Sequence, residues 1–169
     1  REMSSIIKSK KRIEKKDWVY YLNGAKLVTK PWGNATIDGI ENVGEVWLNY
    51  RRGEQVGDEK KRYVMKLLYV KAGTRMSFQY HVEKLETNFL LSGQMEVFLE
   101  NERGESERRV IGSNGIWTIP NKRKHRATAL TDIVMIEAST PDVDDVIRIE
   151  DDTGRGDGRI ESEHRNVKN

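Results

Sequence analysis

The chain contains no cysteine, and its longest apolar runs fall far short of a membrane span. The first absence excludes disulfides, thiolate metal sites and cysteine nucleophiles. The second excludes a spanning helix, which needs about 20 apolar residues. The N-terminal residues 1–17 lack the apolar centre of a signal peptide, and their acidic residues Glu2 and Glu14 fit a transit peptide poorly. We therefore expect no membrane partner and a cytoplasmic location.

The charges are numerous but nearly balanced. Charged residues make up 34% of the 169 residues, with a net charge of +3 that comes largely from residues 1–17. A basic arm of this kind contacts nucleic acid or anionic lipid in some proteins and is a solvated tail in most. No basic patch with interleaved aromatics follows it, so nucleic-acid binding is not favoured. The length predicts one domain, which we place at residues 18–155, between a flexible basic arm (1–17) and a flexible charged tail (156–169).

Short strand patterns separated by glycine-containing turns dominate the middle of the chain. No pattern of a three-turn helix lies between them, and this rhythm is typical of an antiparallel sandwich or barrel. An acidic stretch from Pro141 to Asp145 predicts the start of a short helix, because carboxylates favour a helix N-terminus. The predicted strands are residues 44–50, 62–71, 75–81, 88–91, 94–100, 107–111, 115–119, 126–130 and 133–138.

Four side chains that can bind a metal recur around two of these strands. Gln79 and His81 are two residues apart and share a strand face. Glu86 follows after a turn, and His125 stands 44 residues beyond His81 at the start of a strand. These four converge on one divalent cation only if the strands are neighbours in a closed sheet. Such a set of oxygen and imidazole donors suits Zn, Mn, Fe, Co or Ni without choosing among them. The bland alternative is that the histidines are packed residues and that Gln79 bonds to backbone.

Further polar residues are candidates for a barrel interior. Lys66 shares a strand face with Val64 and Leu68, which favours a meeting with an anion or carboxylate unless that face is the outer one. Glu83 shares strand parity with Gln79 and His81, unless the strand has already ended and Glu83 lies in the turn. Arg148 lies in an alternating apolar segment. Other cations gather near the histidines, where they either bind a phosphorylated or carboxylated ligand or form a solvated rim: Arg75, Lys84, Lys122, Arg123, Lys124 and Arg126.

At these residues the chain resembles the cupin superfamily. The first cupin motif is Gly, five residues, His-x-His, three or four residues, Glu, six residues, Gly. Gly73, Gln79, His81, Glu86 and Gly93 fit it, with glutamine in the first histidine position. Pro120 and His125 match the second motif, which lacks its glycine here.

The glutamine makes the chain similar to type II phosphomannose isomerases, including the isomerase half of bifunctional mannose-1-phosphate guanylyltransferases. Three more stretches carry this resemblance: Lys-Pro-Trp-Gly at 30–33, Val-Lys-Ala-Gly-Thr-Arg-Met-Ser-Phe-Gln at 70–79, and the acidic segment 144–155. The family's His-His-His-Arg-x-Glu-His reads His-Val-Glu-Lys-Leu-Glu-Thr at 81–87, so two histidines and an arginine are replaced.

The resemblance implies an all-β cupin, a double-stranded β-helix or jelly-roll barrel, with one divalent metal held by Gln79, His81, Glu86 and His125. It implies an aldose–ketose isomerase acting on a mannose-6-phosphate-like sugar. Glu83 and Lys66 would then be catalytic. The expected substrate-binding residues are Arg75, Lys84, Arg148 and Arg155.

Two other activities fit the altered sequence around the metal: another metal-dependent cupin enzyme, such as an oxygenase or lyase, or a non-catalytic sugar-binding cupin. Barrels of this type commonly pair through strand exchange near the N-terminus, so the resemblance also admits a homodimer formed through residues 18–21.

Overall fold

A computed structural model describes residues 25–48, 50–51, 54–55, 63–142, 144–152, 154–155 and 158–159. Within these residues the protein is built of antiparallel strands, and no helix is long and apolar enough to cross a membrane. The N-terminal arm and residues 18–21 lie outside the described residues. Of the predicted C-terminal tail, only the short strand at 158–159 is described.

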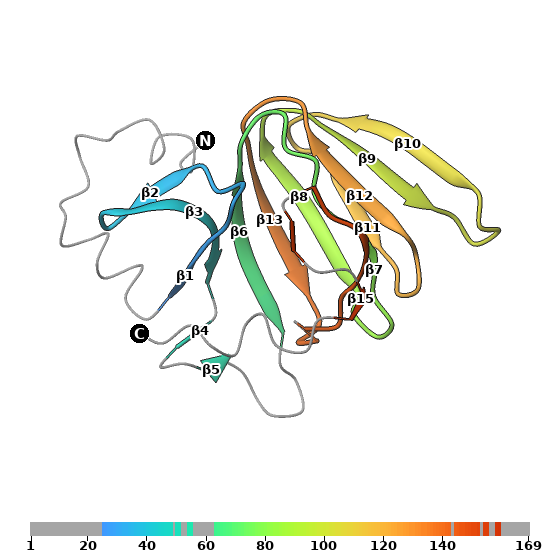
Figure 1. The fold of residues 1–169 in the computed structure, drawn as a ribbon, viewed down its shortest axis with the longest axis horizontal. Helices are drawn as coiled ribbons and strands as arrows, with labels where there is room; N and C mark the ends of the chain where they lie inside the picture. The colour runs from blue at the N-terminus through green and yellow to red at the C-terminus, as the bar shows by residue number, and fades with distance from the viewer. Residues whose placement is uncertain are drawn as a thin grey trace.

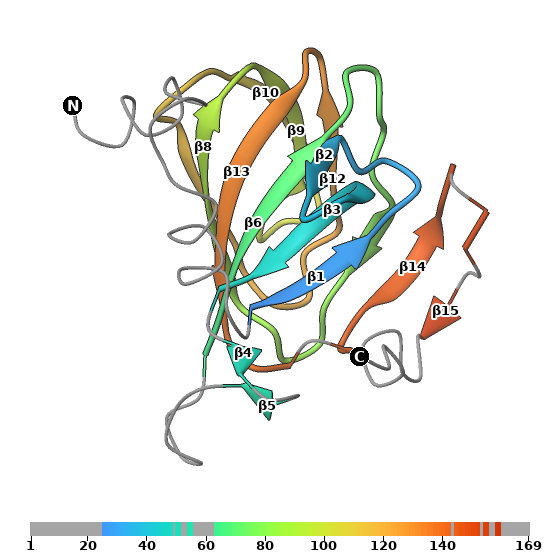
Figure 2. The same ribbon diagram turned by 90° about the vertical axis from the view of Figure 1, so that its left-hand side faces the viewer.

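The strands form two large sheets and one small hairpin. The seven-stranded sheet has the order β1-β3-β6-β13-β8-β11, with β2 also paired to β3, and the six-stranded sheet has the order β10-β9-β12-β7-β14-β15. In Figure 1 the β9–β10 hairpin projects at one side of the molecule, and Figure 2 shows β8, β13, β6, β3 and β1 in sequence across one face. The strands of the seven-stranded sheet are β1 (Lys26–Thr29), β2 (Ala35–Ile37), β3 (Ile40–Trp47), β6 (Val64–Val70), β8 (Glu86–Ser92), β11 (Ile116–Ile119) and β13 (Ile133–Ser139). Those of the six-stranded sheet are β7 (Phe78–Tyr80), β9 (Met95–Glu100), β10 (Ser106–Ile111), β12 (His125–Ala129), β14 (Ile147–Glu150) and β15 (Gly158–Arg159), and the hairpin is β4 (Tyr50–Arg51) with β5 (Glu54–Gln55).

The apolar core lies between the two sheets. Strand β6 shows how the sequence produces it, because Val64, Leu68 and Val70 are buried while Met65, Leu67 and Tyr69 are only partly so. Lys66 shares their buried face, as its parity predicted. Side chains from both sheets complete the core: Trp32, Leu90, Met95, Val97, Trp117, Ile119, Ala129, Ile133 and Met135.

The turn between β8 and β9 depends on a glycine. Gly93 has φ of +92°, and a Cβ there would lie 2.4 Å from the carbonyl oxygen of Asp132. Any other residue would have to adopt a left-handed backbone and displace the neighbouring turn. This position is the closing glycine of the first cupin motif.

The sequence prediction of strands is confirmed, since each of the nine predicted strands overlaps a strand of the structure. Strands β1, β2, β5, β14 and β15 were not predicted. The short helix predicted from Pro141 is wrong for the described residues there, which form a turn in which Asp145 N–H donates to the Asp142 carbonyl at 3.2 Å.

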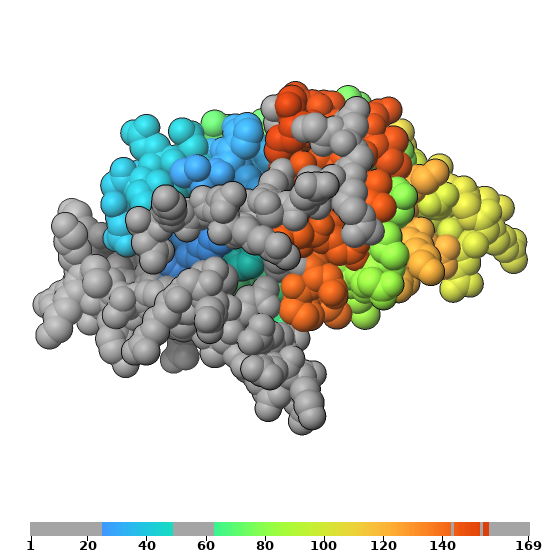
Figure 3. Space-filling model, turned by 60° about the horizontal axis from the view of Figure 1, so that its bottom comes forward, coloured from blue at the N-terminus to red at the C-terminus, as the bar shows by residue number. Residues whose placement is uncertain are grey.

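The physical reason for the missing helix lies in Asp145. Its carboxylate accepts the backbone N–H groups of Val82, Glu83 and Lys84 at 3.1, 2.5 and 2.8 Å. These donors hold the pKa of Asp145 below its ordinary value, although burial alone would raise it. The Asp145 carboxylate therefore caps the β7–β8 turn and does not cap the predicted helix. In Figure 3 the described C-terminal residues, orange to red, cross the surface between the blue N-terminal strands and the green-to-yellow strands.

Candidate metal centre and cavity

Three of the predicted metal ligands meet at the ends of their strands. His81 follows β7, Glu86 begins β8 and His125 begins β12. One ligand atom from each lies within 4.8 Å of the other two, and all three side chains are buried. The imidazole rings of His81 and His125 are 4.9 Å apart between centroids. Separations of this size allow one cation to contact all three residues.

Backbone carbonyls fix the tautomer of both histidines. His81 Nδ1 donates to the Asp145 carbonyl at 2.6 Å, and His125 Nδ1 donates to the Arg123 carbonyl at 2.9 Å. Each Nε2 then carries a lone pair, which is the usual arrangement of a metal-binding histidine. His81 Nε2 is buried, has no hydrogen-bond partner among the described residues, and faces Glu86 Oε2 at 3.5 Å.

Burial lowers the pKa of His125 to about 4, with the nearby Glu86 carboxylate opposing the shift. His125 is therefore neutral at physiological pH. Neutral imidazole is the form that binds a metal.

Gln79 lies beside this centre without being one of the three converging donors. It pairs directly with His125 across β7 and β12, and its side chain lines the same cavity. Its Oε1 accepts a hydrogen bond from the Ser77 hydroxyl. The amide is thus close to the site and already has a partner.

Glu86 is held by two neighbours that the sequence did not single out for this purpose. Lys84 Nζ donates to Glu86 Oε2 at 2.5 Å, and Asn88 Nδ2 donates to Oε1 at 3.2 Å. Burial alone would raise the pKa of Glu86, but the Lys84 ammonium and the two imidazoles hold it well below its ordinary value. The carboxylate is ionised, as a metal ligand must be, and an ammonium group shares it.

Lys84 was predicted to bind substrate, and the structure places it in a buried ion-pair cluster. Its Nζ also contacts Glu137 Oε2 at 3.4 Å. Burial alone would lower the pKa of Lys84, but the Glu137 and Glu86 carboxylates raise it above its ordinary value. The residue stays charged.

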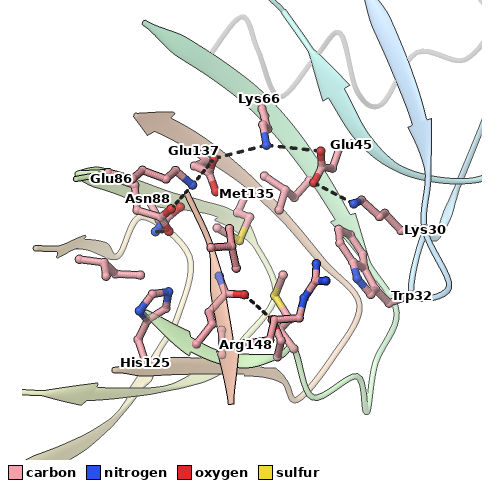
Figure 4. Close-up of a pocket in the computed structure, with 18 of the residues that line it drawn as sticks. Lys30, Trp32, Glu45, Lys66, Glu86, Asn88, His125, Met135, Glu137 and Arg148 are labelled. Atoms are coloured by element: carbon pink, nitrogen blue, oxygen red, sulfur yellow. Dashed lines mark hydrogen bonds and ion pairs between the residues drawn. The ribbon is translucent and has the colours of Figure 1, made fainter. Parts of the chain in front are cut away.

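A row of alternating charges continues from this cluster along the inner wall. Lys66 Nζ lies 3.8 Å from Glu137 and 3.4 Å from Glu45, and Lys30 Nζ lies 3.7 Å from Glu45. Figure 4 shows these side chains curving around one side of the cavity. In order along the wall they are Lys30, Glu45, Lys66, Glu137, Lys84 and Glu86.

The cavity has a volume of about 110 Å³. By the same measure one water needs about 10–15 Å³, so there is room for several waters or a small ligand. Its floor is shared with the apolar core through Trp32, Leu68, Trp117, Ile119 and Met135. Polar wall and apolar floor together are typical of a small-molecule site.

Some of the remaining predicted site residues line the cavity and others do not. Arg148 is buried, pairs with Gln79 across β14 and β7, and lines the cavity. Arg155 also lines it, with its guanidinium on Asp151 at 3.1 Å. Arg75 does not line it: its side chain is 51% exposed and bound to Asp152.

Glu83 is exposed and does not line the cavity, which agrees with the alternative that it lies in the turn after the strand. Strand β7 ends at Tyr80, so the strand parity does not extend to residue 83.

Glu45, Asn88 and Glu137 are site residues that the sequence reasoning missed. Each is a polar residue within a strand, buried next to apolar residues of the same strand. A charged or amide side chain at such a position was the signal that could have found them.

Comparison with known proteins gives a family match and several structural neighbours. The profile of the family described as mannose-6-phosphate isomerase C-terminal matches residues 22–151, more than half of the chain. The search of curated proteins found no match. The coconut allergen cocosin is similar in structure, with a TM-score of 0.56 and 12% identity over 70% of this chain and 32% of that chain.

CapF, solved with the inhibitor 3-isopropenyl-tropolone, has a TM-score of 0.53 and 16% identity over 72% of this chain and 33% of that chain. Oxalate decarboxylase from Bacillus subtilis has a TM-score of 0.48 and 16% identity over 52% and 24% of the two chains. The chain thus spans a third or less of the length of these proteins. At such identities the likeness to cocosin and CapF is one of fold.

Proposed function

The chain belongs to the mannose-6-phosphate isomerase C-terminal family and has the cupin fold, and from this premise we propose that it is a metal-dependent aldose–ketose isomerase of a phosphorylated sugar. One observation carries the proposal. The donors His81, Glu86 and His125 meet beside a cavity that also holds Glu137, a carboxylate between two ammonium groups. A metal site and a base for proton transfer then adjoin one small cavity.

The donor set fits a divalent cation. His81, Glu86 and His125 would hold it, with Gln79 as a fourth ligand once its amide turns from Ser77. The chemistry of the donors suits Zn, Mn, Fe, Co or Ni. When bound, the metal supplies Lewis-acid polarisation of the sugar's carbonyl and hydroxyl oxygens.

Glu137 is the residue that we propose as the general base. Glu86 is one of the proposed metal ligands, and Glu83 lies outside the cavity lining. Glu137 would take the proton from the hydroxyl-bearing carbon next to the carbonyl and return it to the carbonyl carbon, while the proton of that hydroxyl passes to the former carbonyl oxygen, so that no net proton is consumed. Lys84 would fix the orientation of its carboxylate.

Arg148 and Arg155 are proposed to bind the phosphate. Both guanidinium-bearing side chains line the cavity, and arginine suits the planar recognition of phosphate oxygens. The Asp151 carboxylate on Arg155 fixes the direction of that guanidinium. The exposed Arg75 is not part of this proposal.

The contact between Lys84 and Glu86 favours a second candidate, a sugar-binding cupin without turnover. An ammonium at 2.5 Å from a ligand oxygen competes with a metal for the same carboxylate. If the ammonium wins, the cavity keeps its polar wall and loses its Lewis acid.

An isomerase assay with metal analysis separates the two candidates. Purified protein loaded in turn with Zn, Mn, Fe, Co and Ni is expected to interconvert mannose 6-phosphate and fructose 6-phosphate or another pair in a panel of sugar phosphates. Glu137→Gln should lower kcat by about 10²–10⁴-fold without loss of bound metal. Glu83→Gln is the matched control and should keep its activity.

Sugar binding without turnover under every metal would support the second candidate. Full activity in Glu137→Gln would refute the assignment of the base.

A further inference from the structure

A buried hydrogen-bond donor without an acceptor stands in the cavity wall far along the chain from the histidines. Trp32 is 4% exposed and lines the cavity, and its Nε1 has no hydrogen-bond partner among the described residues. Most buried donors in proteins are satisfied. An unsatisfied indole N–H in the wall of a cavity therefore indicates a ligand that brings the acceptor.

The tryptophan is placed there by a glycine on the adjacent strand. A Cβ at Gly44 would lie 2.7 Å from Lys30 Cβ and 2.8 Å from the Trp32 ring. Only a residue without a side chain lets the indole pack so closely against β3. The position of Trp32 is thus built into the backbone.

Lys66 supplies a second set of donors on the same wall. Its ammonium lies 3.4 Å from Glu45 and 3.8 Å from Glu137, beyond the ~2.7–2.9 Å of a charge-assisted hydrogen bond. It also lies 4.2 Å over the Trp47 ring, whose Nε1 donates to Glu45 Oε2 at 2.8 Å. The buried indole of Trp47 therefore fixes both the ammonium and the carboxylate.

Lys66 and Glu45 belong to the row of charges that runs on to Glu86, and Trp32 lies beside Lys30 at the far end of that row. In Figure 4 Trp32, Lys30 and Glu45 lie on one side, and Glu86 and His125 lie on the other. The charges on this wall alternate between lysine and glutamate, which leaves little net attraction for an anion. Donors and acceptors side by side match hydroxyl groups, since each hydroxyl both donates and accepts.

We infer that Trp32, Glu45 and Lys66 form a subsite for the uncharged hydroxyl groups of a sugar's carbon chain. The indole N–H and the ammonium donate to hydroxyl oxygens, and Glu45 accepts from a hydroxyl proton. This inference rests on the proposed function and assigns to it the residues that would bind the sugar's hydroxyl groups, separate from the arginines proposed for its phosphate.

The test uses the full chain and sorbitol, a neutral hexitol that has neither phosphate nor carbonyl. Titration followed by NMR or calorimetry should give saturable binding. Trp32→Phe keeps the ring and removes the N–H, and should weaken that binding by about 2- to 10-fold, the range of one neutral hydrogen bond. Lys66→Met should weaken it further, because a charged donor is lost. Trp117→Phe, at a second tryptophan of the cavity floor, is the matched control and should change it by less than about 2-fold.

Absent sorbitol binding, or equal loss in Trp32→Phe and Trp117→Phe, would overturn the inference. Circular dichroism of each variant shows whether it folds. If Trp32→Phe does not fold, the loss of sorbitol binding in Lys66→Met tests the inference. Because sorbitol cannot be isomerised, a failed isomerase assay with intact, Trp32-dependent binding removes the proposed reaction and keeps the subsite. Turnover with a KM unchanged in Trp32→Phe removes the subsite and keeps the reaction.

Discussion

Replacing Lys84 with methionine removes one ammonium group from the candidate metal centre and keeps most of the side chain's length. In the protein this ammonium lies 2.5 Å from Glu86 and 3.4 Å from Glu137, fully buried. Without it two buried carboxylates lose their shared counter-ion. Breaking a buried pair in this way costs about 3–5 kcal/mol of the free energy of unfolding. For a chain of this size the melting temperature should fall by about 6–20 °C.

A divalent cation should reverse this loss, because it offers the carboxylates the positive charge that Lys84 supplied. We expect Lys84→Met to bind Zn²⁺ on the order of 10- to 100-fold more tightly than the parent protein, the range over which groups next to metal ligands act. Calorimetric titration with Zn²⁺ measures the affinity. Thermal unfolding with EDTA and with excess Zn²⁺ measures the rescue, which mass action makes larger in the variant.

Lys71→Met is the control for this experiment, since Lys71 is exposed and has no part in the candidate metal centre. Its stability should stay within about 0.5 kcal/mol of the parent, and its metal affinity should not change. Equal stability of Lys84→Met and the parent in EDTA would refute the reasoning, as would an unchanged or lower Zn²⁺ affinity.

Three other predictions concern pH, phosphate binding and the turn that carries the histidine. Because the pKa of His125 is about 4 in the folded protein and about 6.5 unfolded, the unfolded state binds more protons between these values. The free energy of unfolding of metal-free protein should then fall by at most about 3 kcal/mol as pH drops from 6.5 to 4. Urea titrations should show this fall in the parent protein and not in His125→Gln. Arg148→Ala should raise the KM for a sugar phosphate at least about tenfold, while Arg75→Ala should leave the KM unchanged. Steady-state kinetics with the reverse result would contradict the assignment of Arg148, and not Arg75, to the cavity. Asp145→Ala should leave three backbone N–H groups of the β7–β8 turn without their acceptor, which lowers the free energy of unfolding by about 1–3 kcal/mol and weakens Zn²⁺ binding. An unaltered Zn²⁺ titration would show that the turn keeps its conformation without Asp145.

The sequence predicted the strands and the cupin fold because both depend on local patterns. The alternation along β6 is sufficient by itself to assign Lys66 to the same face as Val64 and Leu68. The convergence of His81, Glu86 and His125 was expected only through the resemblance to the two cupin motifs, because these residues come from separate strands. The alternation could not place Glu83, because parity has no meaning after β7 ends and the chain turns.

What the sequence could not show are the contacts between distant strands. Lys84 was predicted to bind substrate, and its burial depends on Glu137, 53 residues away. Glu137 itself faces Lys66 only through the register of β13 on β6. The register of the strands and the closure of the sheets decide which charged side chains meet, and neither can be deduced from a single segment of the chain.

Asp145 joins two parts of the site that the chain separates by more than sixty residues. Its carbonyl orients the His81 ring and its carboxylate caps the adjoining turn. The link from β13 to β14 therefore has a set length, and adding or deleting a residue there would shift the carbonyl away from the imidazole. Natural or engineered insertions should be tolerated at the exposed hairpin tip of residues 102–105 and rejected between residues 140 and 145.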